Sequence, residues 1–173
     1  YTSEAVSRAL EYGVRCIEHG NLIDKNTAQL MVRKEAFLIP TLVTLDAMQK
    51  EGTSWGLPQV SMDKLQVVRK AGLDVLEMTH KEGVKVGFGT DLLGELHHYQ
   101  SLEFSIRAQI LTPFEVIQSA TVINAELVKK SGELGVIQAG ALADLLVVDG
   151  NPLKDLNLLQ EQGKYLPLIM KGG

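Results

Sequence analysis

Apolar residues along this chain recur either at helical spacing or in short unbroken runs. Three segments have the helical spacing, namely residues 3–12, 24–36 and 61–80. Three short apolar runs lie between and after these segments and predict buried strands, at residues 14–17, 37–44 and 84–88. Strands that alternate with helices in this way indicate parallel βαβ units, so the pattern predicts a mixed α/β fold.

Local start signals support the predicted helices. Asp24 is a residue type that favours the N-cap, and it directly precedes the second helical segment. The sharpest signal is "TPFEVIQSAT", in which Thr112 is the expected cap, Pro113 takes the first helical position and Glu115 completes a capping box. This motif predicts a further helix that begins at Pro113 and runs to about residue 130.

Two segments depart from the alternation. Residues 46–60, which contain "EGTSWGLP", form the longest irregular candidate, and loops of this length are usually functional or mobile. Residues 131–173 hold glycine-bounded, β-branched segments without a long helix, which predicts a short antiparallel β unit. We therefore expect a βα part over residues 1–130 and a small β part over residues 131–173.

Composition places the chain among globular proteins. It has 173 residues, of which 45% are hydrophobic, and a net charge of −4, so it holds one domain's worth of sequence with enough apolar content for a core. The mild acidity gives no reason to expect nucleic acid or an anionic membrane surface as a partner. No apolar run approaches the length that spans a bilayer.

The ends of the chain and its single cysteine bear on the compartment. No initiator methionine or signal peptide opens the sequence, so we expect the natural N-terminus to lie elsewhere. The default expectation is a cytoplasmic protein, although an absent N-terminal segment could have carried a signal. Cys16 cannot form an internal disulfide, and its apolar strand predicts a buried structural thiol in a reducing compartment.

Polar side chains end two of the predicted strands. "VKVGFGTD" stops on Asp91, and "VRCIEHG" carries Glu18 and His19. In parallel sheets ligands bind outside the carboxyl ends of the strands, so His19 and Asp91 are expected at one site. Each has a structural alternative, since a strand-end Asp often caps the next segment and a lone His is often structural or exposed. Their equivalent positions in a repeating pattern favour a metal site.

At this point the sequence resembles a known family. The segments "CIEHG", "TLVT", "GFGTD", "SATVINAELV" and "GVIQAGALADLLVVDGNP" occur in this order and resemble the C-terminal part of metal-dependent amidohydrolases. The branch that they resemble contains imidazolonepropionase-like and Xaa-Pro dipeptidase (prolidase)-like enzymes. The resemblance implies a distorted (β/α)8 TIM-like barrel with a small β-sandwich domain built from both ends of the chain.

The resemblance also implies roles for particular residues. The family binds metal through an H-x-H pair on strand one, a carboxylated Lys on strand four, one His each on strands five and six, and an Asp on strand eight. By motif, His19 matches the sixth-strand His and Asp91 the eighth-strand Asp, which would also carry the proton from attacking water to the leaving amine. Thr41 and Thr44 on the seventh strand would face the pocket.

Two further residues are expected near the substrate. Tyr1 begins where the family's fifth-strand His would have passed, which suggests a pocket residue at the mouth of that strand. His97 follows the eighth strand in "LLGELHHYQS" and is expected near the pocket mouth, with an exposed loop histidine as the alternative. A cation should meet a substrate carboxylate, but Arg107 lies on an expected helix, which argues against it for this role.

The sequence departs from the family in a way that limits the chain. It contains no H-x-H, and three barrel-type strands are far from the eight that closure requires. We therefore interpret it as a C-terminal portion: about strands six to eight with their helices, plus the C-terminal strands of the β-sandwich domain. Its open sheet edges would need a cover, either the remainder of the barrel or another copy of the chain.

The expected function is metal-dependent hydrolysis of amide (C–N) bonds in small peptides or amides, most simply dipeptides or N-acylated amino acids. The implied cofactor is a divalent metal, zinc by ligand type and binuclear in the complete enzyme. The isolated chain is expected to lack a complete active site. The alternative from a different class is a non-catalytic α/β binding or assembly module that has kept the sheet and lost the chemistry.

Overall fold

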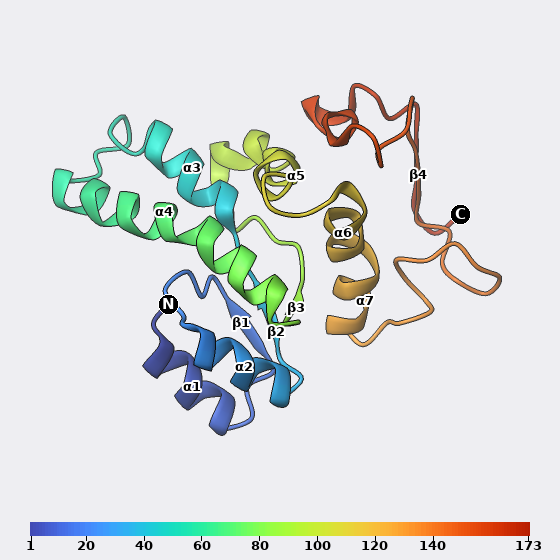
Figure 1. Cartoon of the computed structure of the whole chain (residues 1–173). Coiled ribbons are helices and arrows are strands. Elements are labelled where there is room, and N and C mark those ends of the chain that lie inside the picture. Colours follow the sequence, from blue (N-terminus) through green and yellow to red (C-terminus); the bar gives the residue numbers. More distant parts are fainter. The chain divides into compact units, whose positions relative to one another are not determined.

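The chain folds as two compact units. The computed structural model describes all 173 residues and divides them into a first unit, Tyr1–Gln100, and a second unit, Ser101–Gly173. Figure 1 follows the chain through both. The first unit contains a parallel sheet with helices, and the second contains short helices and one antiparallel strand pair. The mixed α/β class predicted from the sequence is confirmed.

The first unit alternates helices with strands. In chain order its elements are α1 (Ser3–Glu11), β1 (Cys16–Glu18), α2 (Lys25–Arg33), β2 (Phe37–Ile39), α3 (Leu42–Glu51), α4 (Gln59–Lys81), β3 (Lys85–Val86) and the 3-10 helix η1 (Gly94–Tyr99). The strands are parallel and lie in the order β1-β2-β3. Their carboxyl ends therefore share one edge, and β2 is the strand that neighbours both others.

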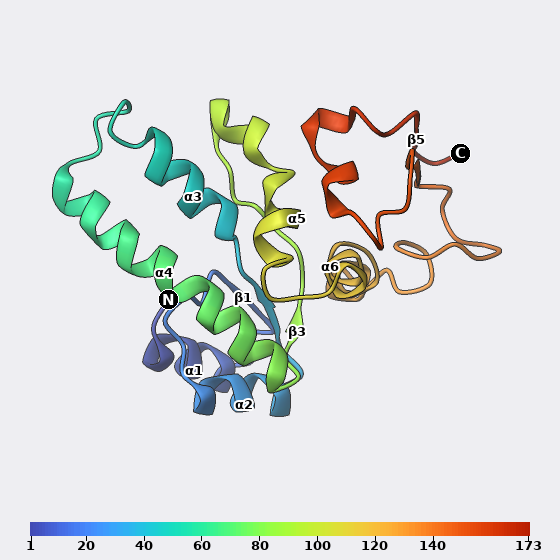
Figure 2. The same cartoon turned by 45° about the horizontal axis from the view of Figure 1, so that its top comes forward.

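Burial and capping hold this unit together. Leu38 in the middle of β2 and Leu76 in α4 are completely buried, and burying such a side chain contributes about 1.5–3 kcal/mol. Asp24 caps α2 as predicted, because its carboxylate accepts a 2.8 Å hydrogen bond from the Thr27 N–H. That hydrogen bond holds the pKa of Asp24 below its usual value. Figure 2 shows that α3 and α4 lie side by side, as they do in Figure 1.

The segment 37–44 corrects one prediction. The sequence predicted a single strand, but β2 ends at Ile39 and α3 begins at Leu42. Pro40 has no N–H to continue the ladder, so the chain leaves the sheet there. The remaining apolar run is the buried start of a helix, and a short apolar run does not distinguish a buried strand from a buried helix.

The prediction that residues 46–60 are irregular is also wrong for more than half of them, because these residues are helical. Helix α3 continues to Glu51, and α4 begins at Gln59, so only residues 52–58 connect the two helices. Ala47 is buried, which shows that this part of α3 is a packed helix. The helical spacing of apolar residues is weak here because α3 buries consecutive residues at its start instead of one narrow stripe.

The second unit contains short helical segments followed by turns. Its elements are α5 (Leu102–Arg107), α6 (Pro113–Gln118), the π-helix η2 (Ser119–Ile123), α7 (Asn124–Leu127), β4 (Leu145–Val147), the 3-10 helices η3 (Leu156–Leu159) and η4 (Glu161–Gly163), and β5 (Leu168–Met170). The capping box of Thr112 and Glu115 is present, with Pro113 at the first helical position, as predicted. Strands β4 and β5 pair antiparallel.

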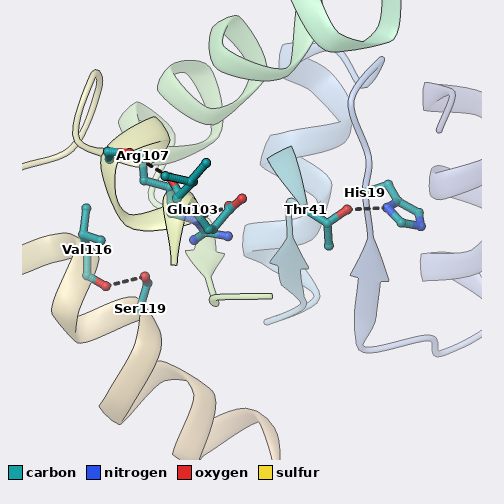
Figure 3. Close-up of polar contacts among 8 residues, drawn as sticks. His19, Thr41, Glu103, Arg107, Val116 and Ser119 are labelled. Atoms are coloured by element: carbon teal, nitrogen blue, oxygen red, sulfur yellow. Dashed lines mark hydrogen bonds and ion pairs between the residues drawn. The ribbon is translucent and has the colours of Figure 1, made fainter. Parts of the chain in front are cut away.

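A π-helical turn interrupts the helix expected over residues 113–130. The Ser119 hydroxyl donates to the Val116 carbonyl at 2.6 Å (Figure 3), and the Thr121 hydroxyl donates to the Ile117 carbonyl at 2.7 Å. Hydroxyls that bond carbonyls of the preceding turn compete with the backbone ladder and loosen the helix. The sequence predicted the helix start correctly, but not this interruption.

The antiparallel pair β4–β5 exposes apolar side chains. Val147 and Ile169 are half-exposed or more, and Ile137 is exposed over 91% of its surface. Two strands alone make a marginal sheet. The assignment of residues 131–173 to a β-sandwich stays a prediction, as does the boundary at residue 130. No helix in either unit is both long and apolar enough to cross a bilayer.

Cys16 in β1 is a half-buried thiol that donates a 2.8 Å hydrogen bond to the Glu18 carboxylate. Burial, the hydrogen bond and the negative charge of Glu18 raise the pKa of the thiol from 9.0 to about 12. The thiolate is therefore about a thousandfold rarer in the folded chain than in the unfolded chain near neutral pH. The sequence predicted a buried structural thiol, but Cys16 is only half-buried, and its low reactivity depends on Glu18 as well as on burial.

We expect iodoacetamide to alkylate Cys16 much more slowly in the folded chain than in urea, and Glu18→Gln to speed the reaction. Because the folded pKa is raised, this group stabilises the fold below pH about 9 and the contribution is lost as the pH rises towards 12. Alkylation rates measured by mass spectrometry test the expected differences in reactivity. Equal rates in folded and unfolded chain would contradict it.

Candidate active site

The carboxyl edge of the parallel sheet brings two predicted residues together. His19 directly follows β1, and Asp91 lies in the segment that leaves β3. Nε2 of His19 is 3.6 Å from Oδ2 of Asp91. The imidazole is 27% exposed and the carboxylate 54% exposed, so both are accessible to a small ligand. Because the strands are parallel, their carboxyl ends lie at the same edge of the sheet, and the residues that follow β1 and β3 lie close together there.

Both residues have left-handed backbones. The φ angle of His19 is +70° and that of Asp91 is +52°. For a residue with a Cβ this region costs about 1–2 kcal/mol. Backbone strain of this kind occurs preferentially at functional sites, where the surrounding structure holds a side chain in a required direction. The sequence alone gave no sign of this feature.

Tyr1 lies against the histidine. Its ring stacks on the His19 ring with centroids 5.1 Å apart and planes 7° from parallel. The Tyr1 carbonyl accepts a 3.2 Å hydrogen bond from the Leu22 N–H, which ties it to the segment after β1. Burial and the negative charge of Asp91 raise the pKa of the Tyr1 phenol. The phenol therefore stays protonated and able to donate a hydrogen bond at neutral pH.

Two threonines from the start of α3 complete the contacts at this edge. Oγ1 of Thr41 lies 2.8 Å from Nδ1 of His19, and Figure 3 shows the hydroxyl directed at the ring. The Thr44 hydroxyl donates to the Asp91 backbone carbonyl at 3.1 Å. Both threonines are buried. The sequence predicted that these threonines face the site from a strand, whereas the structure places them at the start of a helix.

The His19–Asp91 pair fits part of a metal site. With the Nδ1 side of the ring hydrogen-bonded to Thr41, Nε2 and a carboxylate oxygen face each other at 3.6 Å. Zinc binds nitrogen and oxygen ligands at about 2 Å, so each of these two side chains has an accessible atom of a suitable type for a divalent ion. No group of three or more His, Cys, Asp or Glu side chains gathers anywhere in this chain to hold a metal ion. The pair by itself offers two donor atoms, one nitrogen and one oxygen.

His97 and Arg107, which the sequence also singled out, lie outside this group of contacts. His97 is exposed on η1 and makes none of the contacts that join Tyr1, His19 and Asp91. The Arg107 guanidinium is completely buried in the second unit, where its Nε donates to the Glu103 carboxylate at 2.6 Å (Figure 3). Arg107 is thus occupied in an internal ion pair, in agreement with the argument against it as a carboxylate-binding residue.

These features define an α/β protein with a cluster of polar side chains beyond the carboxyl ends of its parallel strands, where such folds bind ligands. Residues 2–173 match the amidohydrolase family, and the chain belongs to this family. The resemblance inferred from the sequence is thereby confirmed.

Solved structures of prolidases are similar to this chain. One, a prolidase in complex with N-methylphosphonate-L-proline, is 48% identical with a TM-score of 0.96, and the match covers 100% of this chain and 42% of that one. An Xaa-Pro dipeptidase with methionine bound in its active site is 29% identical with a TM-score of 0.86, covering 98% of this chain and 41% of that one.

One curated relative is named as an ochratoxinase and not as a prolidase. The ochratoxinase of Aspergillus niger is 29% identical over 170 residues, which are 97% of this chain and 35% of that protein. The chain thus spans between a third and a half of the length of these relatives. The remainder of each relative has no counterpart in these 173 residues.

Proposed function

We propose that this chain supplies part of the active site of a metal-dependent hydrolase that cleaves amide (C–N) bonds. The observation that carries the proposal is the 3.6 Å approach of His19 Nε2 to Asp91 Oδ2 at the carboxyl edge of a parallel sheet. Membership of the amidohydrolase family supports it. In this proposal the chain corresponds to about strands six to eight of a (β/α)8 barrel and to the C-terminal strands of a small β-sandwich domain.

His19 and Asp91 are the residues that would hold the metal, and zinc suits an imidazole–carboxylate donor pair. In a binuclear site each would serve a different ion. A divalent metal there supplies Lewis acidity, which polarises an amide carbonyl and makes water a stronger acid. Asp91 is the proposed proton carrier: it takes the proton from the attacking water and gives it to the leaving amine. Its half-exposed carboxylate is open to both groups.

The proposed substrates are dipeptides or N-acylated amino acids with a free carboxylate. Two similar structures hold a proline derivative and methionine, and both are amino-acid ligands. The protonated phenol of Tyr1 supports a role as a hydrogen-bond donor to such a substrate. His97 follows Asp91 closely in the chain, is exposed, and is proposed as a second substrate contact at the mouth of the site.

The site needs residues that this chain does not contain. Two donors do not complete a coordination sphere, and the similar prolidase chain is more than twice as long. The remainder of the barrel, or another copy of the chain, is the proposed partner that covers the sheet edges. Half-exposed apolar residues on β4 and β5, such as Val147 and Ile169, are consistent with a missing neighbour.

We expect the 173-residue chain by itself to bind Zn²⁺ weakly and to hydrolyse no Xaa-Pro dipeptide. A chimera in which it replaces the matching segment of the 48% identical prolidase is expected to bind zinc tightly and to hydrolyse the dipeptide. Zinc content after dialysis and release of proline measure the two properties. Tight zinc and hydrolysis by the chain alone would refute the incomplete site, whereas a folded but inactive chimera would favour the non-catalytic module.

A further inference from the structure

The middle strand of the sheet ends in residues that contact both candidate metal ligands. Strand β2 lies between β1 and β3, so its carboxyl end is the place from which one segment reaches His19 and Asp91 together. Thr41 forms a hydrogen bond with the His19 ring, and Thr44 forms one with the Asp91 main-chain carbonyl. Both threonines lie within five residues of the end of β2. The two contacts act on different parts of the ligands, a side chain in one case and a backbone in the other.

Thr41 holds a capping position and does not cap. It is the N-cap residue of α3, where a threonine hydroxyl ordinarily accepts from an N–H of the first turn, yet it makes no such hydrogen bond. Its hydroxyl is 2.8 Å from His19 Nδ1 instead. A cap of this kind is worth about 1 kcal/mol, so this contact replaces a contribution to helix stability.

Tight packing keeps Thr41 in this place. Gly89 in the segment leaving β3 lies so close to β2 that a Cβ on it would be 2.6 Å from Ile39 Cγ2 and 3.8 Å from Thr41 Cγ2. The His19 N–H donates to the Ile39 carbonyl at 3.0 Å, which ties the other ligand to the same strand end. The residues that follow β1 and β3 therefore both lie against Ile39, the last residue of β2 and two positions before Thr41.

We propose that Thr41 and Thr44 are the positioning residues of the site. Thr41 accepts the Nδ1–H of His19, which fixes the tautomer and directs the Nε2 lone pair at Asp91. Thr44 holds the Asp91 carbonyl and with it the left-handed backbone that aims the carboxylate at His19. The inference rests on the proposed function, because that function requires His19 and Asp91 to be oriented for binding metal. Partners of this kind orient metal-binding imidazoles in general.

The test compares three isosteric variants of the 173-residue chain. Thr41→Val and Thr44→Val each remove one hydroxyl at the site. Thr79→Val is the matched control, because Thr79 is equally buried in the first unit and its hydroxyl bonds only the Val75 and Leu76 carbonyls of its own helix. Thr41→Ser restores the hydroxyl and serves as the rescue.

Two readouts need no metal. Nitrogen NMR of the neutral imidazole should show the Nδ1–H tautomer of His19 in the parent, in Thr41→Ser and in both other variants, and its loss in Thr41→Val. The HN–Hα coupling of Asp91 should report its positive φ in all variants except Thr44→Val. Unchanged tautomer in Thr41→Val and unchanged coupling in Thr44→Val would overturn the proposal.

The third readout is Zn²⁺ affinity by competition with a chromophoric chelator. Thr41→Val and Thr44→Val are expected to lower it about 10–100-fold, while Thr41→Ser and Thr79→Val stay within about threefold of the parent. Equal affinity in all four variants would contradict the positioning roles. A parent chain that binds no zinc at all would count against the proposed function, and the NMR readouts would still decide the inference about the two threonines.

Discussion

Asp91→Asn should abolish hydrolysis by the chimera while leaving the chain folded. General acid–base catalysis contributes about 10²–10⁴-fold, and an amide can neither take nor deliver the proton. Asparagine tolerates the left-handed backbone that Asp91 adopts, and it keeps the main-chain carbonyl that accepts from Thr44. The expected result is a fall in kcat of about that size, with a melting temperature close to that of the parent chimera. Steady-state release of proline from an Xaa-Pro dipeptide measures it.

Asp63→Asn is the matched control for this variant. Asp63 is an exposed carboxylate on α4 that accepts a 2.9 Å hydrogen bond from Gln59 of the same helix and makes no contact with His19 or Asp91. The same loss of charge there should leave turnover unchanged. If Asp91→Asn keeps its turnover, another group moves the proton. If both variants lose activity, the effect belongs to the overall charge.

Gly135→Ala should unfold the second unit locally, at a cost of about 2–4 kcal/mol. A Cβ on Gly135 would lie 2.6 Å from the Thr121 carbonyl carbon and 2.7 Å from its oxygen. These are backbone atoms of the π-helical turn, so no side chain can move aside to make room. The φ angle of +73° adds the strain of a left-handed residue. Hydrogen exchange of residues 113–127 should accelerate, and the urea midpoint should fall.

Gly140→Ala separates the two causes. Gly140 has a similar φ of +88°, but a Cβ on it would meet no atom within 4 Å. It should therefore cost about 1 kcal/mol from backbone strain alone. Equal destabilisation by both substitutions would show that strain, not the contact with Thr121, dominates at Gly135.

The two largest effects arise in different units and from different causes. Asp91 belongs to the sheet edge of the first unit and its proposed role is chemical; it has a left-handed backbone, and its carboxylate lies 3.6 Å from His19. Gly135 belongs to the second unit and has a structural role, since it lets a turn of chain approach the π-helix closely. The first substitution is expected to change rate without stability, and the second to change stability first.

Local sequence signals predicted local structure well. The Asp24 cap and the capping box of Thr112 and Glu115 depend on residues three positions apart, so the sequence contains the whole interaction. The π-turn at Ser119–Ile123 was not predictable in this way, because hydroxyls that bond carbonyls of the preceding turn also occur in a regular helix, as Thr79 does in α4. The end of β2 at Ile39 was missed because an apolar run is the same in a buried strand and a buried helix.

The sequence by itself determined the alternation of helices and strands, and hence that His19 and Asp91 follow parallel strands at one edge of a sheet. It also carried the ordered motifs that place the chain in the amidohydrolase family. Only the tertiary structure decided how these residues meet. Strand order put β2 between β1 and β3, the left-handed backbones turned the two side chains towards each other, and the cap residue Thr41 was directed at His19. These outcomes depend on contacts between residues about 20 to 70 positions apart, which no local pattern encodes.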